Sequence, residues 1–458
     1  MTMFSREIIS DLRKWAANEH RKPLILRGAR QVGKTSVVKQ FAAEFDTFLY
    51  VNLEEKNNKR IFDEFVSLDQ LIIRMFASQG KIQNKGRTLI FFDEIQYSSE
   101  AIKQLRYFYE QRPDLYIIAA GSLLESLIDV HTSFPVGRVQ YMALHPVSFR
   151  EFAKALGHES IIDLIEKQPS ESNAFHEMLM ALFKNYLLVG GMPEAVNQFV
   201  ESKDIVSLND IFDTLLVSYK DDVEKYSSNK TQTEIIRFLM NNLWNLAGQT
   251  ISMTHILGSN YKSREVGEAL RTIEKAMLIE LVYPNSNTSQ PLVQQHTRAP
   301  KLMMLDTGLT NYFAHIQKDI LNADDILDTW KGAIAEHVVG QELLTLTNSV
   351  LAHRNFWSRE RSSAEIDFEY CYEGKIVPVE VKTGHNAKLR SLHSFVDESK
   401  CDVAIRVWSD KYRIDKIKTL NNTPFTLISI PFYLVGYLPR ILSDFISPIF
   451  EKTELLNK

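Results

Sequence analysis

The segment from Gly28 to Thr35 restricts the possible folds of this 458-residue chain more than any other feature. It reads G-A-R-Q-V-G-K-T and fits the pattern G-x-x-x-x-G-K-[ST]. The apolar run Pro23 to Arg27 before it predicts a strand, and the residues Thr35 to Phe45 after it have helical spacing. A strand, a glycine-containing loop and the start of a helix are the context in which this pattern binds phosphate groups. The predicted phosphate-binding residues are Gly28, Ala29, Arg30, Gln31, Val32, Gly33, Lys34, Thr35 and Ser36.

Two residues of this segment can act directly on a nucleotide. Lys34 can reach the β- and γ-phosphates, and the hydroxyl group of Thr35 can coordinate Mg²⁺. We therefore expect ATP and Mg²⁺ as the cofactors of the chain.

Two neighbouring acidic residues come directly after a second apolar run. Asp93 and Glu94 follow Leu89 to Phe92, which predict a strand buried on both faces. At the carboxyl end of that strand, Asp93 can hold Mg²⁺ through water. Glu94 can orient and deprotonate an attacking water molecule. The second carboxylate favours hydrolysis of ATP over phosphate transfer to a small molecule, unless both acids are plain surface residues.

Ser122 and Arg138 are two further candidates for the same reaction. Ser122 follows the apolar run Tyr116 to Gly121, where its hydroxyl group can sense the γ-phosphate or the water. Its alternative role is to cap the start of a helix. Arg138 can stabilise transition-state charge within its own chain or across a subunit boundary. It can equally be a surface arginine.

The first part of the chain alternates such strands with helices. Further strands are expected at Thr47 to Leu53, Thr88 to Ile95 and Val139 to Leu144. Strands separated by helices predict an α/β fold with a doubly wound parallel sheet.

Short segments along nearly the whole chain resemble the bacterial and archaeal AAA-type P-loop ATPases that carry a restriction-endonuclease-like C-terminal domain of unknown function. The segments that carry this resemblance are Gly28 to Thr35, Phe91 to Gln96, Gly121 to Leu124, Gly137-Arg138, Pro146 to Phe152, Gly190 to Glu194, Leu305 to Leu309 and the helix that contains Glu336. The resemblance implies four parts. They are an ATPase core at 1–145, a helical lid at 146–228, a winged-helix domain at 229–300 and a mixed α/β endonuclease-like domain at 301–458.

The third part has elements of its own that suit a winged helix. Helices are expected at Ile235 to Leu246 and Ser263 to Ala276, followed by a strand at Leu278 to Tyr283. The polar stretch Asn285 to Pro300 reads as a loop or linker. The helix Ser263 to Ala276 can read duplex DNA, or the module can instead dock a protein.

Four residues of the last part resemble the PD-(D/E)xK nuclease site: Glu336, Asp367, Glu380 and Lys382. Strand alternation places Glu380 and Lys382 on one face, which Asp367 on the neighbouring strand can share. Asp367 and Glu380 could then hold Mg²⁺, and the group could hydrolyse a phosphodiester. The alternative is a solvated ion pair between Glu380 and Lys382.

The composition limits the choice of partners. A net charge of −4 makes a globally basic nucleic-acid binder unlikely, although a local basic groove remains open. No segment has the roughly 18 uninterrupted apolar residues of a membrane span, and the N-terminus lacks the apolar core of a signal peptide, so we expect a cytoplasmic protein. The leading hypothesis is an ATP-driven switch with DNA-linked or defence-linked output. The alternative is a regulatory ATPase scaffold that binds a protein through an inactive nuclease-like domain, and the oligomeric state stays open.

Overall fold

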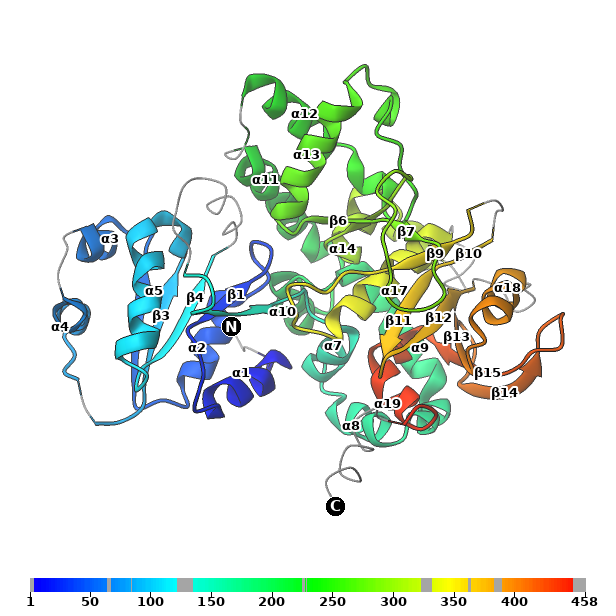
Figure 1. Ribbon diagram of the computed structural model, residues 1–458, viewed down its shortest axis with the longest axis horizontal. Coiled ribbons are helices and arrows are strands. Elements are labelled where there is room, and N and C mark those ends of the chain that lie inside the picture. Colours follow the sequence, from blue (N-terminus) through cyan, green and yellow to red (C-terminus); the bar gives the residue numbers. More distant parts are fainter. Residues whose placement is uncertain are drawn as a thin grey trace. The chain divides into compact units, whose positions relative to one another are not determined.

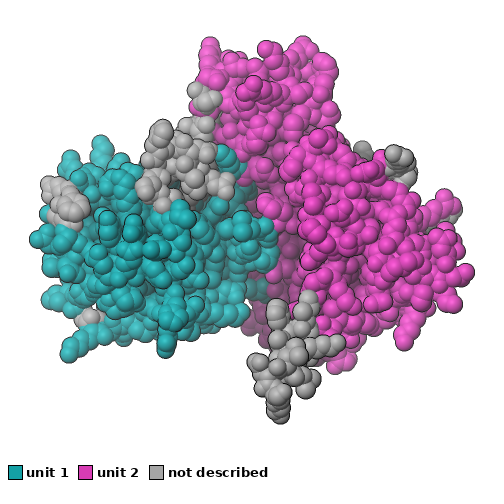
Figure 2. Space-filling model, viewed as in Figure 1, with its two compact units in different colours: residues 1–145, 275–278, 347–352 teal, residues 146–274, 279–346, 353–458 magenta. Residues whose placement is uncertain are grey.

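The computed structural model describes residues 4–63, 67–83, 85–121, 135–224, 227, 229–322, 332–360, 364–382 and 389–447. The chain divides into two compact units, which are coloured separately in Figure 2. Unit 1 comprises Met1–His145, Lys275–Leu278 and Thr347–Ala352. Unit 2 comprises Pro146–Glu274, Ile279–Leu346 and His353–Lys458. None of the helices in the described ranges is long and apolar enough to span a bilayer.

Unit 1 is built on a five-stranded sheet with the strand order β2-β3-β4-β1-β5 (Figure 1). All its neighbouring strands are parallel, so the predicted parallel α/β sheet is confirmed. The strands are β1 (Leu24–Arg27), β2 (Thr47–Asn52), β3 (Thr88–Asp93), β4 (Tyr116–Ala120) and β5 (Gln140–Ala143). The helices are α1 (Ile8–Ala17), α2 (Lys34–Ala42), α3 (Lys56–Asp63), α4 (Leu68–Ser78) and α5 (Ser99–Gln111).

The apolar pattern of these strands explains why the sheet is covered on both faces. All six residues of β3 are buried, as expected for a central parallel strand. One face of the sheet forms a core with residues of α3, α4 and α5, among them Phe62, Met75 and Leu105. Helix α2 packs against β3 and β4, and its Val37, Val38 and Phe41 are buried as their helical spacing predicted.

The predicted strand at Thr88 to Ile95 ends two residues early. β3 stops at Asp93, and Glu94 has the left-handed backbone conformation with φ 50° and ψ 46°. A short 3₁₀ turn, Ile95–Tyr97, follows. The chain therefore turns away from the sheet at the residue where the second carboxylate stands.

Unit 2 begins with a helical segment. Its first helix starts with a capping box, in which Ser148 and Glu151 satisfy each other's backbone N–H groups. The helices are α7 (Phe149–Ala155), α8 (Glu159–Lys167), α9 (His176–Val189), α10 (Pro193–Ser202) and α11 (Asn209–Glu224).

The next segment contains α12 (Lys230–Met240), α13 (Ser263–Lys275) and the antiparallel pair β6 (Ile279–Val282) and β8 (Lys301–Met304). The helix predicted at Ile235 to Leu246 ends at Met240, and a separate 3₁₀ turn covers Leu243–Leu246. The stretch Asn285 to Pro300, which was predicted as a loop or linker, is anchored to β9. Its first residues form β7 (Pro284–Asn285), which pairs with β9 (Phe356–Ser358), and Arg298 donates two hydrogen bonds to Ser358.

The last part of unit 2 holds a mixed five-stranded sheet with the order β11-β12-β13-β15-β14. Its inner pairs β12–β13 and β13–β15 are parallel, and the outer pairs are antiparallel. The strands are β11 (Phe368–Tyr372), β12 (Lys375–Val381), β13 (Val403–Trp408), β14 (Arg413–Lys418) and β15 (Pro424–Pro431), with β10 (Glu365–Ile366) pairing β9. The remaining helices are α14 (Thr307–Phe313), α15 (Gln317–Asn322), α17 (Gly332–Thr345), α18 (Arg390–Ser399) and α19 (Leu438–Ser443).

A buried polar network joins distant segments of unit 2. The carboxylate of Asp306 accepts hydrogen bonds from the backbone N–H groups of Gly191 (2.6 Å) and Leu309 (2.9 Å). A Cβ atom at Gly190 would lie 2.2 Å from the Asp306 carboxylate, so only glycine fits there. Glu342 on α17 accepts hydrogen bonds from the Phe149 N–H group and the Tyr186 hydroxyl group. Residues from the first helical segment of unit 2 therefore share buried hydrogen bonds with Asp306 and Glu342, which lie more than a hundred residues later in the chain.

Candidate functional site

The phosphate-binding loop lies between β1 and α2, at the carboxyl end of the sheet. Gly33 has φ 95°, a left-handed conformation that glycine adopts without strain, and it leads directly into the first turn of α2. The Lys34 ammonium group donates hydrogen bonds to the carbonyl oxygens of Gly28 (2.9 Å) and Ala29 (2.8 Å). The cation is thus held over the loop that would surround the phosphates.

The carboxylate of Asp93 lies beside this loop. The Thr35 hydroxyl group donates a hydrogen bond of 2.8 Å to Asp93 Oδ2, although the two residues are far apart in sequence. A hydroxyl oxygen and a carboxylate oxygen at this distance are ligands that Mg²⁺ accepts, so the residues present fit this ion. The structure brings together the two residues that the sequence predicted as its ligands.

Tyr50 on β2 joins this pair and was missed in the sequence. Its hydroxyl group donates a hydrogen bond of 3.0 Å to the same Asp93 oxygen. Burial and the Asp93 carboxylate raise the pKa of Tyr50 well above its usual range, so it acts as a donor at neutral pH. The β2–β3 register pairs Tyr50 with Phe91, which no local sequence signal reveals.

Glu94 lies next to Asp93, and its side chain is partly buried. The Gln96 amide donates a hydrogen bond to the Glu94 carboxylate and fixes its orientation. Burial raises the pKa of Glu94, while the Gln96 hydrogen bond and the charges of Lys34 and Arg30 lower it, leaving a net upward shift. A carboxylate with a raised pKa is a better proton acceptor, which suits a general base.

Ser122 and Arg138 are the other two candidates for the ATPase reaction. Ser122 lies outside the described residues. Arg138 precedes β5 and pairs with Glu110 at the end of α5, with Arg138 Nε 2.9 Å from Glu110 Oε1. Because β5 runs parallel to β1 with Gln140 beside Leu24, Arg138 lies at the amino ends of the strands, whereas the loop lies at their carboxyl ends. The four-residue strand β1, about 13 Å long, separates Arg138 from the loop of its own chain.

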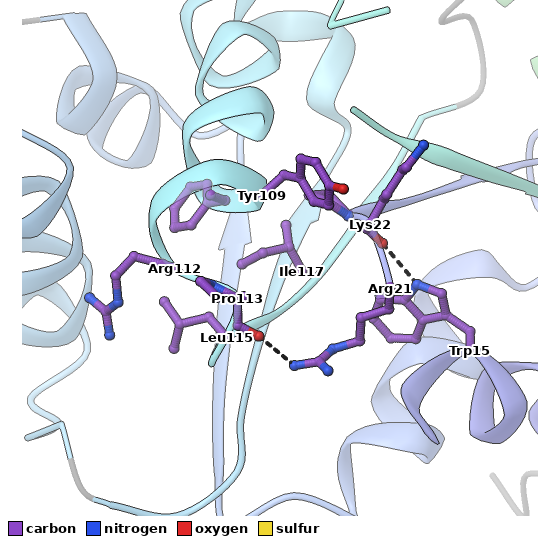
Figure 3. A pocket seen from close by; sticks show the side chains of 10 residues that line it. Trp15, Arg21, Lys22, Tyr109, Arg112, Pro113, Leu115 and Ile117 are labelled. Atoms are coloured by element: carbon purple, nitrogen blue, oxygen red, sulfur yellow. Dashed lines mark hydrogen bonds between the residues drawn. The ribbon is translucent and has the colours of Figure 1, made fainter. Parts of the chain in front are cut away.

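A small cavity in unit 1 also lies at the amino ends of the strands (Figure 3). Its volume is about 10 Å³, room for one water molecule. Two hydrogen bonds line it, from Trp15 Nε1 to the Lys22 carbonyl oxygen (2.9 Å) and from Arg21 to the Pro113 carbonyl oxygen (2.7 Å). The cavity is too small for a nucleotide, so it is not a candidate for the ATP site.

In unit 2, two of the predicted nuclease residues, Glu336 and Asp367, lie around a lysine that the sequence did not indicate. The ammonium group of Lys301 on β8 is 2.8 Å from Glu336 Oε2, 2.6 Å from Glu365 Oε1 and 3.9 Å from Asp367 Oδ1. Its side chain is only 4% exposed. Burial lowers the pKa of Lys301, but the three carboxylates outweigh it and raise that pKa above its usual range. A permanent cation therefore occupies the middle of the acidic group.

The remaining predicted residues stand beside this group. The β11–β12 register, continued by one residue, places Asp367 opposite Glu380. Lys382 forms an ion pair with Glu380, whose second carboxylate oxygen is buried without a hydrogen-bond partner in the described part of the chain. Burial raises the pKa of Glu336 to about 7 and that of Glu380 to about 8, and it also raises the pKa of Asp367.

This arrangement does not fit a divalent metal ion. Within the described residues, no group of three or more histidine, cysteine, aspartate or glutamate side chains is arranged to hold one. The Lys301 ammonium already bonds two of the carboxylates and lies close to a third. Glu365 could have been found from strand alternation, since it stands two residues before Asp367, whereas nothing in the sequence near Lys301 signals its position.

Three family models match successive parts of the chain. A model described as an AAA domain matches residues 20–153. Two models of domains of unknown function, DUF8612 and DUF4143, match residues 180–320 and 331–427. None of the curated proteins compared matches the chain.

Several solved structures are similar to the chain at low identity. The Walker-type ATPase of Pyrococcus abyssi has 15% identity and a TM-score of 0.41, over 68% of this chain and 96% of that one. The ORC1 protein of Aeropyrum pernix, in complex with DNA, has 12% identity and a TM-score of 0.29, over 69% and 93%. The RuvB Holliday junction branch migration motor of Thermotoga maritima has 10% identity and a TM-score of 0.28, over 64% and 93%.

The family match covers the loop, both acidic residues and all five strands of the parallel sheet. Residues 20–153 therefore form a P-loop ATPase domain of the AAA type.

Proposed function

We propose that this chain hydrolyses ATP with Mg²⁺ and acts as a nucleotide-driven switch whose output passes through unit 2, in DNA-linked or defence-linked processes. The observation that carries the proposal is the meeting of Lys34, Thr35, Asp93 and Glu94 at the carboxyl end of one parallel sheet. A binding protein without turnover would need the first three of these residues but not a second carboxylate with a raised pKa.

Each residue has a separate task in this mechanism. Thr35 and Asp93 would hold Mg²⁺, which neutralises charge on the β- and γ-phosphates when bound. Lys34 leaves the Gly28 and Ala29 carbonyl oxygens and turns its ammonium group to the phosphates. Glu94, oriented by Gln96, orients the attacking water and accepts its proton. Ser122 remains our candidate for sensing the γ-phosphate.

The test of nucleotide binding is the substitution Lys34→Ala. It removes the cation facing the β- and γ-phosphates, and a charge-assisted hydrogen bond is worth about 1.5–3 kcal/mol. We expect the Kd for ATP, measured by isothermal titration calorimetry, to rise at least tenfold. Lys39→Ala, on the same helix, is the matched control and should bind ATP nearly as the wild type does. Equal affinity of the Lys34 variant and the wild type would contradict the proposed site.

Arg138 is proposed to act on the nucleotide of a neighbouring copy, because in its own sheet it lies at the amino ends of the strands, away from the phosphate-binding loop. Its partner Glu110 is exposed to solvent, so the pair can open at little cost. We expect the turnover per chain to rise with protein concentration. A mixture of Arg138→Ala and Glu94→Gln proteins should recover part of the wild-type activity, because each supplies what the other lacks. Activity independent of concentration, with no recovery on mixing, would leave Arg138 only a structural role.

A second candidate function concerns the output of unit 2. The Lys301 ammonium group among the carboxylates favours a nuclease-like region that binds a partner without cleaving DNA over an active metal-dependent nuclease. DNA and a protein both remain candidate partners. A plasmid assay with Mg²⁺ or Mn²⁺ separates the two functions. Nicking of the plasmid by the wild type that is lost in Asp367→Ala would support an active nuclease.

A further inference from the structure

One face of the mixed sheet in unit 2 carries a row of polar residues that runs across β12, β13, β15 and β14, with Asp367 directly before β11. The pairing places Glu380 beside Arg406, Arg406 beside Ser429 and Ser429 beside Arg413. The β11–β12 register, continued by one residue, places Asp367 opposite Glu380. Residues paired in this way point to the same face of a sheet. The acidic group and two arginines therefore share one row, which we call the Arg406 row.

The position of this row within the sheet is that of a ligand site. The apolar core under α18 uses the same face nearer the amino ends of the parallel strands, through Ile376, Ala404 and Leu427. The row begins where this apolar cover ends, toward the carboxyl ends of β12, β13 and β15. Ligands of α/β sheets bind outside the carboxyl ends of parallel strands.

One donor atom of Arg406 is unused by the residues that the structure describes. The residue is only 9% exposed, and its Nε donates a hydrogen bond of 3.0 Å to the Ser429 hydroxyl group. Its Nη2 atom is buried and has no hydrogen-bond partner in the ranges that the structure describes. An unpartnered donor on a buried charged group costs free energy, which an anionic ligand would recover.

A second guanidinium group stands beside the first. Arg406 lies 3.8 Å from the centre of the Trp408 ring, and Arg413 lies 5.6 Å from the same point. Arg413 bonds Asp415 through Nε (2.7 Å), and its side chain is 59% exposed. Burial and the charge of Arg413 lower the pKa of Arg406, while Asp415 and Asp410 oppose that shift. The two guanidinium groups beside one indole ring place two positive charges close together, and a phosphate group can neutralise both.

We propose that Arg406 and Arg413 form a phosphate-binding site for the backbone of a nucleic-acid strand, one strand of the sheet away from Glu380. Arg413 meets the phosphate at the surface, and Arg406 contacts it from beneath. Trp408 is 6% exposed and holds Arg406 in place rather than stacking on a base. The site reads charge and not base sequence, since only backbone phosphates meet the two arginines.

The choice of a nucleic acid over a free phosphate group rests on the proposed DNA-linked function of unit 2. The two sources share the phosphate chemistry, and the assay has one arm for each. Neither arm contains ATP or metal ions, so a failure of phosphate binding and a failure of ATP hydrolysis remain separate results.

The first arm measures binding of a fluorescent single-stranded DNA oligonucleotide by fluorescence anisotropy in EDTA. Arg406→Gln and Arg413→Gln should each weaken binding about tenfold, because each removes a charge-assisted contact. The slope of log K against log salt should become shallower by about 0.7 for each lost phosphate contact. The control is Lys416→Gln, which removes one exposed charge from the opposite face of β14 and should change Kd by less than about twofold.

The second arm adds inorganic phosphate as a competitor at constant ionic strength. We expect phosphate to weaken DNA binding by the wild type and to have a smaller effect on Arg413→Gln. Because Arg413 is exposed, its variant keeps the test valid even if Arg406→Gln fails to fold, which thermal denaturation would report. Equal effects of Arg413→Gln and Lys416→Gln, or no DNA binding by the wild type, would overturn the proposal. Phosphate binding without DNA binding would overturn its nucleic-acid part.

Discussion

Glu94→Gln should reduce the rate of ATP hydrolysis about 10²- to 10⁴-fold and leave the affinity for ATP nearly unchanged. The amide has the shape of the carboxylate and can still be held by Gln96, but it cannot accept a proton from water. Binding depends on Lys34, Thr35 and Asp93, which the substitution does not touch. Phosphate release measured at saturating ATP, together with calorimetric ATP binding, separates the two effects.

The pH dependence of the wild type gives an independent check on Glu94. A general base works only when it is ionised, so the rate falls as the pH drops below its pKa. Because burial raises the pKa of Glu94 above that of an ordinary glutamate side chain, the acidic limb of the rate profile should lie at a higher pH than an exposed glutamate would give. Glu55→Gln, an exposed acid near the same strand edge, serves as the control and should keep its turnover. A Glu94→Gln protein that hydrolyses ATP at the wild-type rate would rule out this base.

Lys301→Met should lower the free energy of unfolding by about 3–5 kcal/mol at a pH above 8, because it leaves buried carboxylates without their cation. The loss should be smaller below pH 7, where Glu336 and Glu380 can take up protons instead of staying charged. These carboxyl groups bind protons more tightly in the folded than in the unfolded chain. Their contribution to stability therefore falls as the pH rises, and it should fall more steeply in the variant. Urea denaturation at several pH values measures the difference.

The matched control is Lys375→Met. Lys375 also begins a strand and pairs with an acid, Asp402, but its side chain is 57% exposed, so its loss should cost at most about 1 kcal/mol. Adding Mn²⁺ extends the test. If Mn²⁺ raises the free energy of unfolding of the Lys301 variant and not of the wild type, the Lys301 ammonium group occupies a position where a metal cation can replace it. Equal stability of variant and wild type at every pH would contradict the role given to Lys301.

The residues of the candidate ATP site could be selected from the sequence because its signals are local. A strand, a loop and a helix follow one another within a few residues, and Asp93 and Glu94 stand directly after an apolar run. The carboxyl ends of parallel strands meet at one edge, so the strands alone place these residues near each other. Tyr50 could not be found in this way, because its contact with Asp93 depends on the register between two strands.

The acidic group of unit 2 was predicted only in part, for a related reason. Alternation along β12 correctly placed Glu380 and Lys382 together. The cation among the carboxylates comes from β8, far from Asp367 in sequence, and sequence spacing carries no information about such a contact. Strands β14 and β15 were also missed. Prolines bound β15 at both ends, and Arg413 to Lys418 has too few apolar residues to read as a buried strand.

The buried network around Asp306 and Glu342 restricts how this protein can change during evolution. Gly191 and Phe149 supply N–H groups to carboxylates that stand more than a hundred residues later in the chain. Recombination that replaced one of these segments alone would leave a buried carboxylate without its donors, which costs several kcal/mol. The segments must then be inherited together, although three separate family models match them. A chimaera made from two relatives should therefore exchange everything from Pro146 onward as one piece.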